Sequence, residues 1–321
     1  MIDFKTFQSS KISFIFWIIS KLNIKFLVTL ICLLFLGASI YANFDDLSKQ
    51  TINLREILWL SCGILFSFLS IIINAYAWKM LIISIGCNSK KLNIVKIFLN
   101  TNMYKYLPGG IWHFVSRFNI LRLNFSIQKS VESILLEPLL MLVAGLIFIP
   151  FGNSNIYIWI ICWSSPLVFL PRLRDFIIKN LKLMKSNIFT NSEKVIDKNF
   201  VKNKPNNSTE IFYPYKSLLI EIIFILFRYL GFFCCISAFN MGSLLSQWQL
   251  ISSFSLAWII GLIVPAAPGG LGVFESVFLF SLASQLPEAP LLAALLCYRL
   301  ASTVADIFAA LVFPVKRLLK V

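Results

Sequence analysis

The sequence predicts an all-α, polytopic integral membrane protein. Its 321 residues are 58% apolar and only 13% charged, with a mean hydropathy of +0.82, whereas soluble domains are about 45–50% apolar and about 25% charged. A chain of this composition would expose a large apolar surface in water, so lipid must be its solvent. The alternating segments of about ten residues that typify a transmembrane β-barrel are absent from the sequence.

Basic residues set the predicted orientation in the membrane. The net charge is +15, and Lys and Arg gather in the first 25 residues, between Lys79 and Lys129, in 172–216 and near the C-terminus. Cytoplasmic flanks of membrane spans carry such an excess, which also suits contact with anionic lipid headgroups. We therefore expect a multi-pass protein of the plasma or inner membrane with both termini cytoplasmic. No segment supplies the basic soluble face that nucleic-acid binding requires.

The cysteines and short motifs indicate neither a metal site nor a redox site. The seven cysteines lie mostly inside apolar runs, with no Cys-x-x-Cys and no Cys/His ligand spacing, so they are interpreted as small apolar filler. No Walker-type Gly-Lys-Ser/Thr motif occurs, and ATP use by the chain itself is not expected. We expect no cofactor.

About eight transmembrane helices are predicted, with broken segments between them. An amphipathic interfacial helix at 12–20 precedes the first span. Residues 97–120 predict a re-entrant hairpin, because basic residues lie on both sides of it. With both ends inside, the external connections hold only Lys49 and Arg55 as basic residues. The predicted spans are about 26–42, 56–78, 131–150, 156–171, 217–239, 248–265, 272–286 and 290–313.

The chain is predicted to form a single membrane domain, 1–321, built from two halves. The first half covers 20–171 and the second covers 217–315. Between them, 172–216 is polar and basic and is interpreted as a cytoplasmic linker. At about 45 residues, this linker is too short to be an independent enzyme domain.

Each half is interrupted once by Pro-Gly-Gly, and the two interruptions lie 160 residues apart: Pro108, Gly109 and Gly110, then Pro268, Gly269 and Gly270. Proline removes a backbone donor, and paired glycines tolerate backbone that no helix uses. In lipid, broken backbone survives only where protein buries it or where it lines a wet cavity. Matching interruptions in two halves therefore predict an internal repeat with a transport or binding site between the breaks. We expect both breaks to open from the same, cytoplasmic face.

Charged residues inside predicted spans are candidate site residues, because placing a charge in lipid is costly. Two pairs of opposite charge lie seven residues apart, so each pair shares one helical face. The members of a pair neutralise one another or neighbours within the bundle, or they serve a site, and the sequence leaves these readings open. The charged positions are Glu132, Glu137, Glu221, Arg228, Glu275, Arg299 and Asp306, with the pairs Glu221/Arg228 and Arg299/Asp306.

The candidates divide by the chemistry they offer. Arg117 lies just after the first break, where a cation beside exposed helix-end amides makes an anion site suited to a phosphate. Arg299, in the middle of a span, is the second candidate for phosphate capture. Glu137 and Glu275 would recognise a cationic headgroup, carry protons or cap helix N-termini. His113 is the chain's only histidine, and it is either a binding residue or an ordinary satisfied polar residue.

The segments around the two breaks carry a family resemblance. Tyr106-Leu107-Pro108-Gly109-Gly110-Ile111-Trp112 with Arg117, and Pro265-x-x-Pro268-Gly269-Gly270-Leu271-Gly272-Val273-x-Glu275, resemble the two signature segments of the lysylphosphatidylglycerol synthase transmembrane (flippase) domain family. The resemblance covers about 20–315. It implies a multi-span, repeat-built module that translocates lipids between leaflets. The site residues it implies are Pro108, Gly109, Gly110, Arg117, Pro268, Gly269, Gly270, Gly272 and Glu275.

The sequence departs from the pattern of this family at two places. Full-length synthases append a soluble aminoacyl-transferase domain, but only eight residues follow Phe313 here, so a stand-alone member without aminoacyl transfer is expected. In addition, Phe274 stands where many relatives carry Arg, which leaves Glu275 without an adjacent cation in the sequence.

Two functions follow as hypotheses. The favoured one is a flippase-like translocase of a phospholipid or a lipid-linked sugar, with Arg117 and Arg299 meeting the phosphate and the tails left in the bilayer. The alternative is a membrane-embedded transferase, or an accessory subunit of one, acting on lipid phosphates with His113 or Glu137 as general base. The expected partners are membrane lipids with anionic or sugar headgroups and an envelope-assembly transferase, and self-association stays open.

Overall fold

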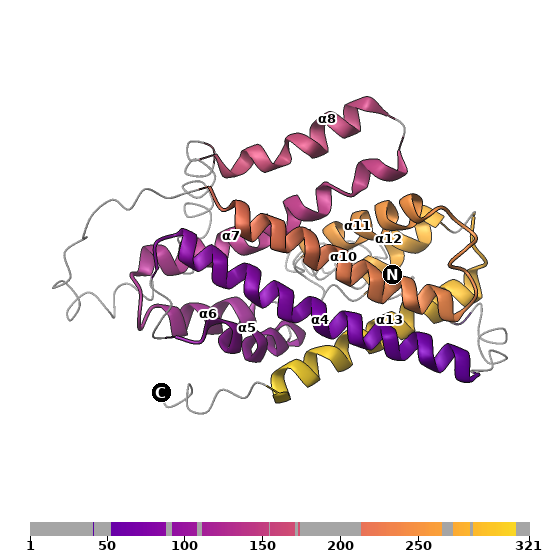
Figure 1. The fold of residues 1–321 in the computed structure, drawn as a ribbon, viewed down its shortest axis with the longest axis horizontal. Helices are drawn as coiled ribbons and strands as arrows, with labels where there is room; N and C mark the ends of the chain where they lie inside the picture. The colour runs from indigo at the N-terminus through magenta and orange to yellow at the C-terminus, as the bar shows by residue number, and fades with distance from the viewer. Residues whose placement is uncertain are drawn as a thin grey trace, which may run out of the picture.

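The computed structural model describes Tyr41, 53–87, 92–107, 111–153, 155–170, Leu173, 213–264, 272–282 and 285–312. Throughout these residues the chain forms helices and no strand (Figure 1), which confirms the predicted all-α class. The predicted interfacial helix at 12–20, the span at 26–42, both Pro-Gly-Gly triplets and nearly all of the linker 172–216 lie outside the described residues.

The described helices follow the predicted order of apolar segments. Among the described residues, four helices are long and apolar enough to cross a membrane, and three are shorter. The described helices of the first half are α4 (Leu54–Ser84), α5 (Ile94–Asn102), η2 (Met103–Tyr106), α6 (Trp112–Leu121), α7 (Ile127–Leu146), η3 (Ile149–Gly152), α8 (Ile156–Ser164) and η4 (Ser165–Phe169). Those of the second half are α10 (Tyr215–Ala238), α11 (Gln247–Ile263), α12 (Val273–Leu282) and α13 (Glu288–Val312).

Local sequence signals explain where several helices begin. Before α11, the Ser246 hydroxyl accepts a hydrogen bond from the backbone N–H of Gln249, whose side chain reaches back to Ser246, so the two form a capping box. Ser126 caps α7 in the same way, by accepting from the N–H of Lys129. α4 has 31 residues and is therefore about 46 Å long, which is more than the roughly 30 Å of the hydrocarbon core. Its ends therefore reach the headgroup regions.

The two halves repeat one arrangement of helices. A long helix, a helix before the break, a short helix after it and a second long helix occur as α4, α5, α6 and α7, and again as α10, α11, α12 and α13. Across the halves, α4 packs on α13 as α10 packs on α7, and α5 packs on α13 as α11 packs on α7. Exchanging the halves leaves this contact pattern unchanged, which supports the predicted internal repeat.

The two leading helices, α4 and α10, cross through small residues. They lie side by side (Figure 1), and a Cβ added at Gly63 would lie 3.2 Å from the carbonyl oxygen of Gly231. A Cβ at Gly231 would lie 2.8 Å from the hydroxyl of Ser67. Small residues allow membrane helices to approach closely and gain packing energy. The centre of the repeat is therefore a glycine-to-glycine helix crossing.

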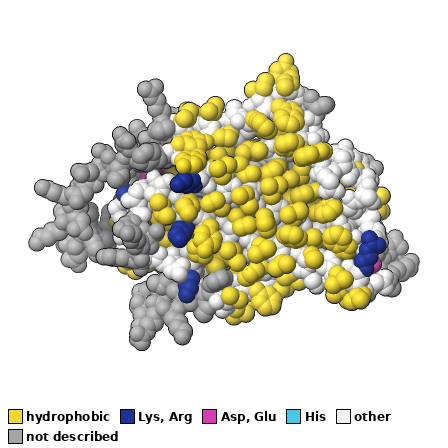
Figure 2. Space-filling view, viewed as in Figure 1, with side chains coloured by type: hydrophobic (Ala, Val, Ile, Leu, Met, Phe, Trp, Pro, Cys, Tyr) yellow, Lys and Arg dark blue, Asp and Glu magenta, His cyan; other side chains and the backbone are white. Residues whose placement is uncertain are grey.

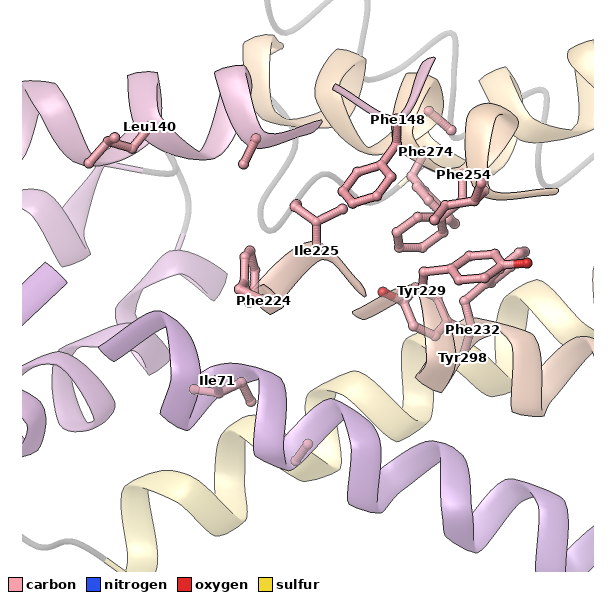
Figure 3. Packing of buried hydrophobic residues seen from close by; sticks show 14 of the residues in the cluster. Ile71, Leu140, Phe148, Phe224, Ile225, Tyr229, Phe232, Phe254, Phe274 and Tyr298 are labelled. Atoms are coloured by element: carbon pink, nitrogen blue, oxygen red, sulfur yellow. The ribbon is translucent and has the colours of Figure 1, made fainter. Parts of the chain in front are cut away.

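An aromatic cluster joins the four helices of the second half. The ring of Phe232 on α10 packs edge-on against that of Tyr298 on α13, with centroids 5.4 Å apart, and the ring of Phe254 on α11 packs edge-on against that of Phe274 on α12, at 5.7 Å (Figure 3). Phe232 also packs edge-on against Phe278 of α12, with ring centroids 4.8 Å apart. Such edge-to-face pairs have defined geometry. Because Phe274 and Tyr298 directly precede Glu275 and Arg299 in the sequence, the cluster fixes the backbone that carries both charges.

The outer surface is suited to lipid. Figure 2 shows a broad face of hydrophobic side chains, with Lys and Arg gathered at its two ends. On α4 this apolar surface includes the exposed side chains Leu58, Leu65 and Tyr76. An apolar belt flanked by basic residues is the surface expected of a protein that spans a bilayer.

Candidate functional site

A cavity of about 290 Å³ lies where the two halves meet. Its lining comes from α4, α5, η2, α6 and α7 of the first half and from α10, α11, α12 and α13 of the second. Lys105 and Ile111 approach the first break from its two sides and line the cavity, as Val264 and Phe274 do at the second break. Described residues on both sides of each break therefore line a single cavity.

Four of the predicted site residues line this cavity: His113, Arg117, Glu137 and Arg299. Glu275 is not part of the cavity lining, but it forms an ion pair with Arg299. Gly272 precedes α12 with a φ of 82°, a left-handed conformation that favours glycine. The six remaining predicted residues, Pro108, Gly109, Gly110, Pro268, Gly269 and Gly270, lie outside the described residues.

In the first half, Arg117 forms a sealed ion pair. The residue is 1% exposed, and its Nη1 lies 2.5 Å from Oε1 of Glu137. Its Nε donates to the Thr101 hydroxyl at 3.0 Å. The guanidinium also lies over the rings of Phe98, at 3.8 Å, and Trp78, at 5.2 Å, where a desolvated cation is attracted to the ring face. Arg117 thus joins α4, α5, α6 and α7.

In the second half, Glu275 and Arg299 form a more open ion pair. The Nε of Arg299 donates to Oε1 of Glu275, and Nη2 lies 3.4 Å from Oε2. Glu275 also accepts the backbone N–H of Gly272 at 2.8 Å, so it caps the N-terminus of α12. The Glu275 side chain is 1% exposed, and that of Arg299 is 19% exposed. Although Phe274 replaces the adjacent Arg of the family pattern, α13 supplies the cation for Glu275.

A third ionic contact crosses between the halves. Asp306 on α13 has a fully buried side chain and lies 2.7 Å from Nζ of Lys105. It also accepts from Tyr106 at 2.5 Å and from the Asn102 amide at 2.8 Å. Because these donors belong to α5 and η2, the carboxylate of Asp306 ties the segment before the first break to the last long helix.

Neither charged pair seven residues apart is joined directly in the described structure, and in α13 both charges bind neighbours in the bundle instead. Asp306 binds Lys105, and Arg299 binds Glu275, so these two residues of α13 do not neutralise each other. No hydrogen bond or ion pair in the described part of the chain joins Glu221 to Arg228, and Glu221 does not line the cavity. Two helical turns separate such positions by about 10 Å along the axis, which is beyond direct contact between these side chains.

Several cavity-lining side chains have buried polar atoms without a partner in the described structure. They are Asn74 Oδ1, His113 Nδ1, Glu137 Oε2, and Nε and Nη1 of Arg228. A buried polar atom without a hydrogen bond costs on the order of 1–3 kcal/mol, so this cluster favours a polar occupant. Sequence reasoning named Arg228 only as a member of the Glu221/Arg228 pair, whose role it left open, and it did not select Asn74 or Lys105.

Within the described ranges, no group of three or more His, Cys, Asp or Glu side chains is arranged to hold a metal ion. The six cysteines that the structure describes are free thiols. What the cavity offers is basic side chains, hydrogen-bonding groups and aromatic faces.

Comparison with known proteins places the chain in a family. No curated protein matches it. The family model described as the lysylphosphatidylglycerol synthase TM region matches residues 22–310, which include both breaks and the described cavity-lining residues. The family acts on lipids in the membrane, in keeping with the apolar belt of Figure 2. The chain therefore belongs to the lysylphosphatidylglycerol synthase transmembrane region family.

Proposed function

We propose that this protein translocates a lipid between the leaflets of the membrane, with the polar headgroup in the cavity between the halves and the tails in the bilayer. The observation that carries the proposal is the convergence of charged residues from both halves on one cavity inside an apolar bundle. A phosphate or sugar is costly to transfer through hydrocarbon without compensating contacts. The basic and hydrogen-bonding lining supplies contacts that replace the headgroup's water.

The repeat provides a physical route for such movement. In transporters built from repeats, the substrate binds at the interface of the repeats, and rocking of one against the other exposes the site alternately. Here the cavity lies at that interface, and the contact of Asp306 with Lys105 crosses it. We propose that this contact opens and reforms as the headgroup moves.

The test is leaflet exchange in proteoliposomes that contain a fluorescent phosphatidylglycerol. Addition of an impermeant quencher reports how fast the inner-leaflet lipid reaches the outer leaflet. We expect the wild-type protein to accelerate exchange at least tenfold over protein-free vesicles and Arg299→Gln to remove most of that gain. Lys216→Gln is the matched control, because Lys216 is exposed at the start of α10 and away from the cavity lining, and it should exchange lipid as the wild type does.

Exchange at the protein-free rate would contradict the proposal. Mass spectrometry of the lipids from the same vesicles tests the alternative function. A covalent change in the lipid phosphate group in the presence of an added headgroup donor, without leaflet exchange, would replace translocation by group transfer.

A further inference from the structure

Arg228, in the middle of α10, lines the cavity and forms no ion pair within the described residues. The residue as a whole is partly exposed, but its Nε and Nη1 are buried and have no hydrogen-bond partner in the described structure. A buried N–H donor without an acceptor is costly, because it has lost its hydrogen bonds to water. This side chain therefore favours an acceptor in the cavity.

The other basic side chains described around the cavity already have carboxylate partners. Lys105 contacts Asp306, Arg117 contacts Glu137, and Arg299 contacts Glu275. Arg228 is the fourth described basic residue of the lining, and no carboxylate in the described ranges forms an ion pair with it. The described cavity thus carries one positive charge beyond its internal ion pairs.

The carboxylate that acts electrostatically on Arg228 is engaged with other residues. The groups coupled to Arg228 are Asp306, Lys105, Tyr106 and Tyr298. Asp306 already accepts from Tyr106 and Asn102 and binds Lys105. Its two oxygens are therefore engaged, and none of these contacts is to the guanidinium of Arg228.

The other buried polar atoms of the cavity that lack hydrogen bonds indicate which further groups a ligand would carry. Asn74 Oδ1 and Glu137 Oε2 are acceptors without a donor, and His113 Nδ1 also lacks a partner. An acceptor in this position is satisfied by a hydroxyl, which donates a hydrogen bond. A guanidinium is satisfied by phosphate oxygens, with which it forms strong charge-assisted hydrogen bonds.

We infer that the cavity selects an anionic phosphodiester headgroup that bears hydroxyl groups, such as a glycerol or sugar phosphate, and that Arg228 binds its phosphate. The inference rests on the proposed function and names the substrate class of the same site. One phosphodiester carries one negative charge and balances the single charge that Arg228 leaves. A lysyl-esterified phosphatidylglycerol has two ammonium groups and a net positive charge, so the account predicts that this headgroup binds more weakly.

The test measures equilibrium binding of ligands to the purified full chain in detergent. The dissociation constant is obtained from the rise in the thermal midpoint of the protein as each ligand is titrated. The probes are dihexanoyl-phosphatidylglycerol, dihexanoyl-phosphatidylcholine, lysyl-phosphatidylglycerol and inorganic phosphate. We expect phosphatidylglycerol to bind at least tenfold more tightly than the choline and lysyl lipids. Arg228→Gln should abolish this preference, Arg228→Lys should retain part of it because the charge remains, and Lys216→Gln should leave it unchanged.

Inorganic phosphate separates a lipid site from a site for the free anion. Binding of phosphatidylglycerol at least tenfold tighter than phosphate supports a site for a lipid headgroup. Equal affinities would show that the site binds the free anion and would overturn the lipid as its ligand. Equal affinities for phosphatidylglycerol and phosphatidylcholine would overturn the inference, and the wild-type protein alone settles this even if Arg228→Gln misfolds. Selective binding without leaflet exchange would refute only the proposed function, and exchange without headgroup preference would refute only this inference.

Discussion

The two halves of the molecule use the same ion-pair design with the charges reversed. In the first half, the short helix after the break carries the cation, Arg117, and the following long helix carries the carboxylate, Glu137. In the second half, the short helix carries the carboxylate, Glu275, and the long helix carries the cation, Arg299. Each pair joins the element after a break to the long helix that follows, so the pair holds the broken segment against its own half.

The pairs differ in how much of the cation is enclosed. The Arg117 side chain is 1% exposed, whereas that of Arg299 is 19% exposed and lines the same cavity. Arg117 has further contacts with Thr101 and the ring of Phe98, so its charge is satisfied from within the first half. We interpret the first pair as a structural clamp and the second as a more accessible wall of the cavity.

The largest expected effect is on stability, from breaking the sealed pair. Glu137→Gln leaves the guanidinium of Arg117 buried without its counter-charge, and removing one partner of a buried pair typically costs about 3–5 kcal/mol. We expect a large fall in the thermal midpoint of the detergent-solubilised protein, measured by intrinsic fluorescence. A midpoint close to that of the wild type would show that the first pair is not a clamp.

Glu275→Gln should destabilise the protein less but slow exchange more. Because Arg299 is partly exposed to the cavity, it regains some solvation when its partner is neutralised, and we expect a stability cost of about 1–3 kcal/mol. The accompanying leaflet-exchange rate should fall at least tenfold, since the second pair shapes the wall of the site. Glu137→Gln and Glu275→Gln should therefore differ in the ratio of stability loss to loss of leaflet exchange. The same ratio for both variants would contradict the distinction between a structural first pair and a cavity-lining second pair.

Asp306→Asn tests the contact that crosses between the halves. The neutral amide keeps the shape of the side chain but loses the charge opposite Lys105, and it contributes a donor facing the donors Asn102 and Tyr106. We expect a cost of about 1.5–3 kcal/mol, the range of hydrogen bonds to charged groups, with altered exchange kinetics. Unchanged kinetics with lowered stability would make this contact purely structural.

The smallest expected effect comes from the ring beneath Arg117. Phe98→Leu removes the aromatic face that lies 3.8 Å from the guanidinium while keeping an apolar side chain in place. A cation–π contact contributes about 0.5–2 kcal/mol, so the thermal midpoint should fall slightly, and the headgroup preference should stay as in the wild type. A changed preference would show that Arg117 itself takes part in headgroup binding.

How much of this could be predicted from the sequence depends on which interactions are local. Composition predicted the all-α membrane class, and the cost of intramembrane charge led to His113, Arg117, Glu137 and Arg299, which all line the cavity. The breaks predicted a repeat because proline and glycine act on local backbone. These signals need no knowledge of which helices are neighbours.

The partners of the charges could not be predicted in this way. Arg228 shares a helical face with Glu221, and Arg299 shares one with Asp306, so the sequence left open pairing within each helix, pairing with neighbours in the bundle, and a role in a site. In the structure Asp306 instead meets Lys105, about two hundred residues earlier in the chain, because α5 and η2 pack on α13. Tertiary packing decides these pairs, and within the described residues it leaves Arg228 without a carboxylate in ion-pair contact.

We propose above that one headgroup contacts both halves of the molecule at once. A phosphatidylglycerol with a photoreactive diazirine on its headgroup, reconstituted with the wild-type protein in nanodiscs, tests this by mass-spectrometric mapping of the crosslinked peptides. We expect crosslinks in both halves: on α6 near Phe114 in the first, and on α10 near Arg228 and α13 near Ser302 in the second. All three residues line the cavity. Crosslinks confined to the lipid-exposed surface, such as Leu58 and Leu65 of α4, would contradict it.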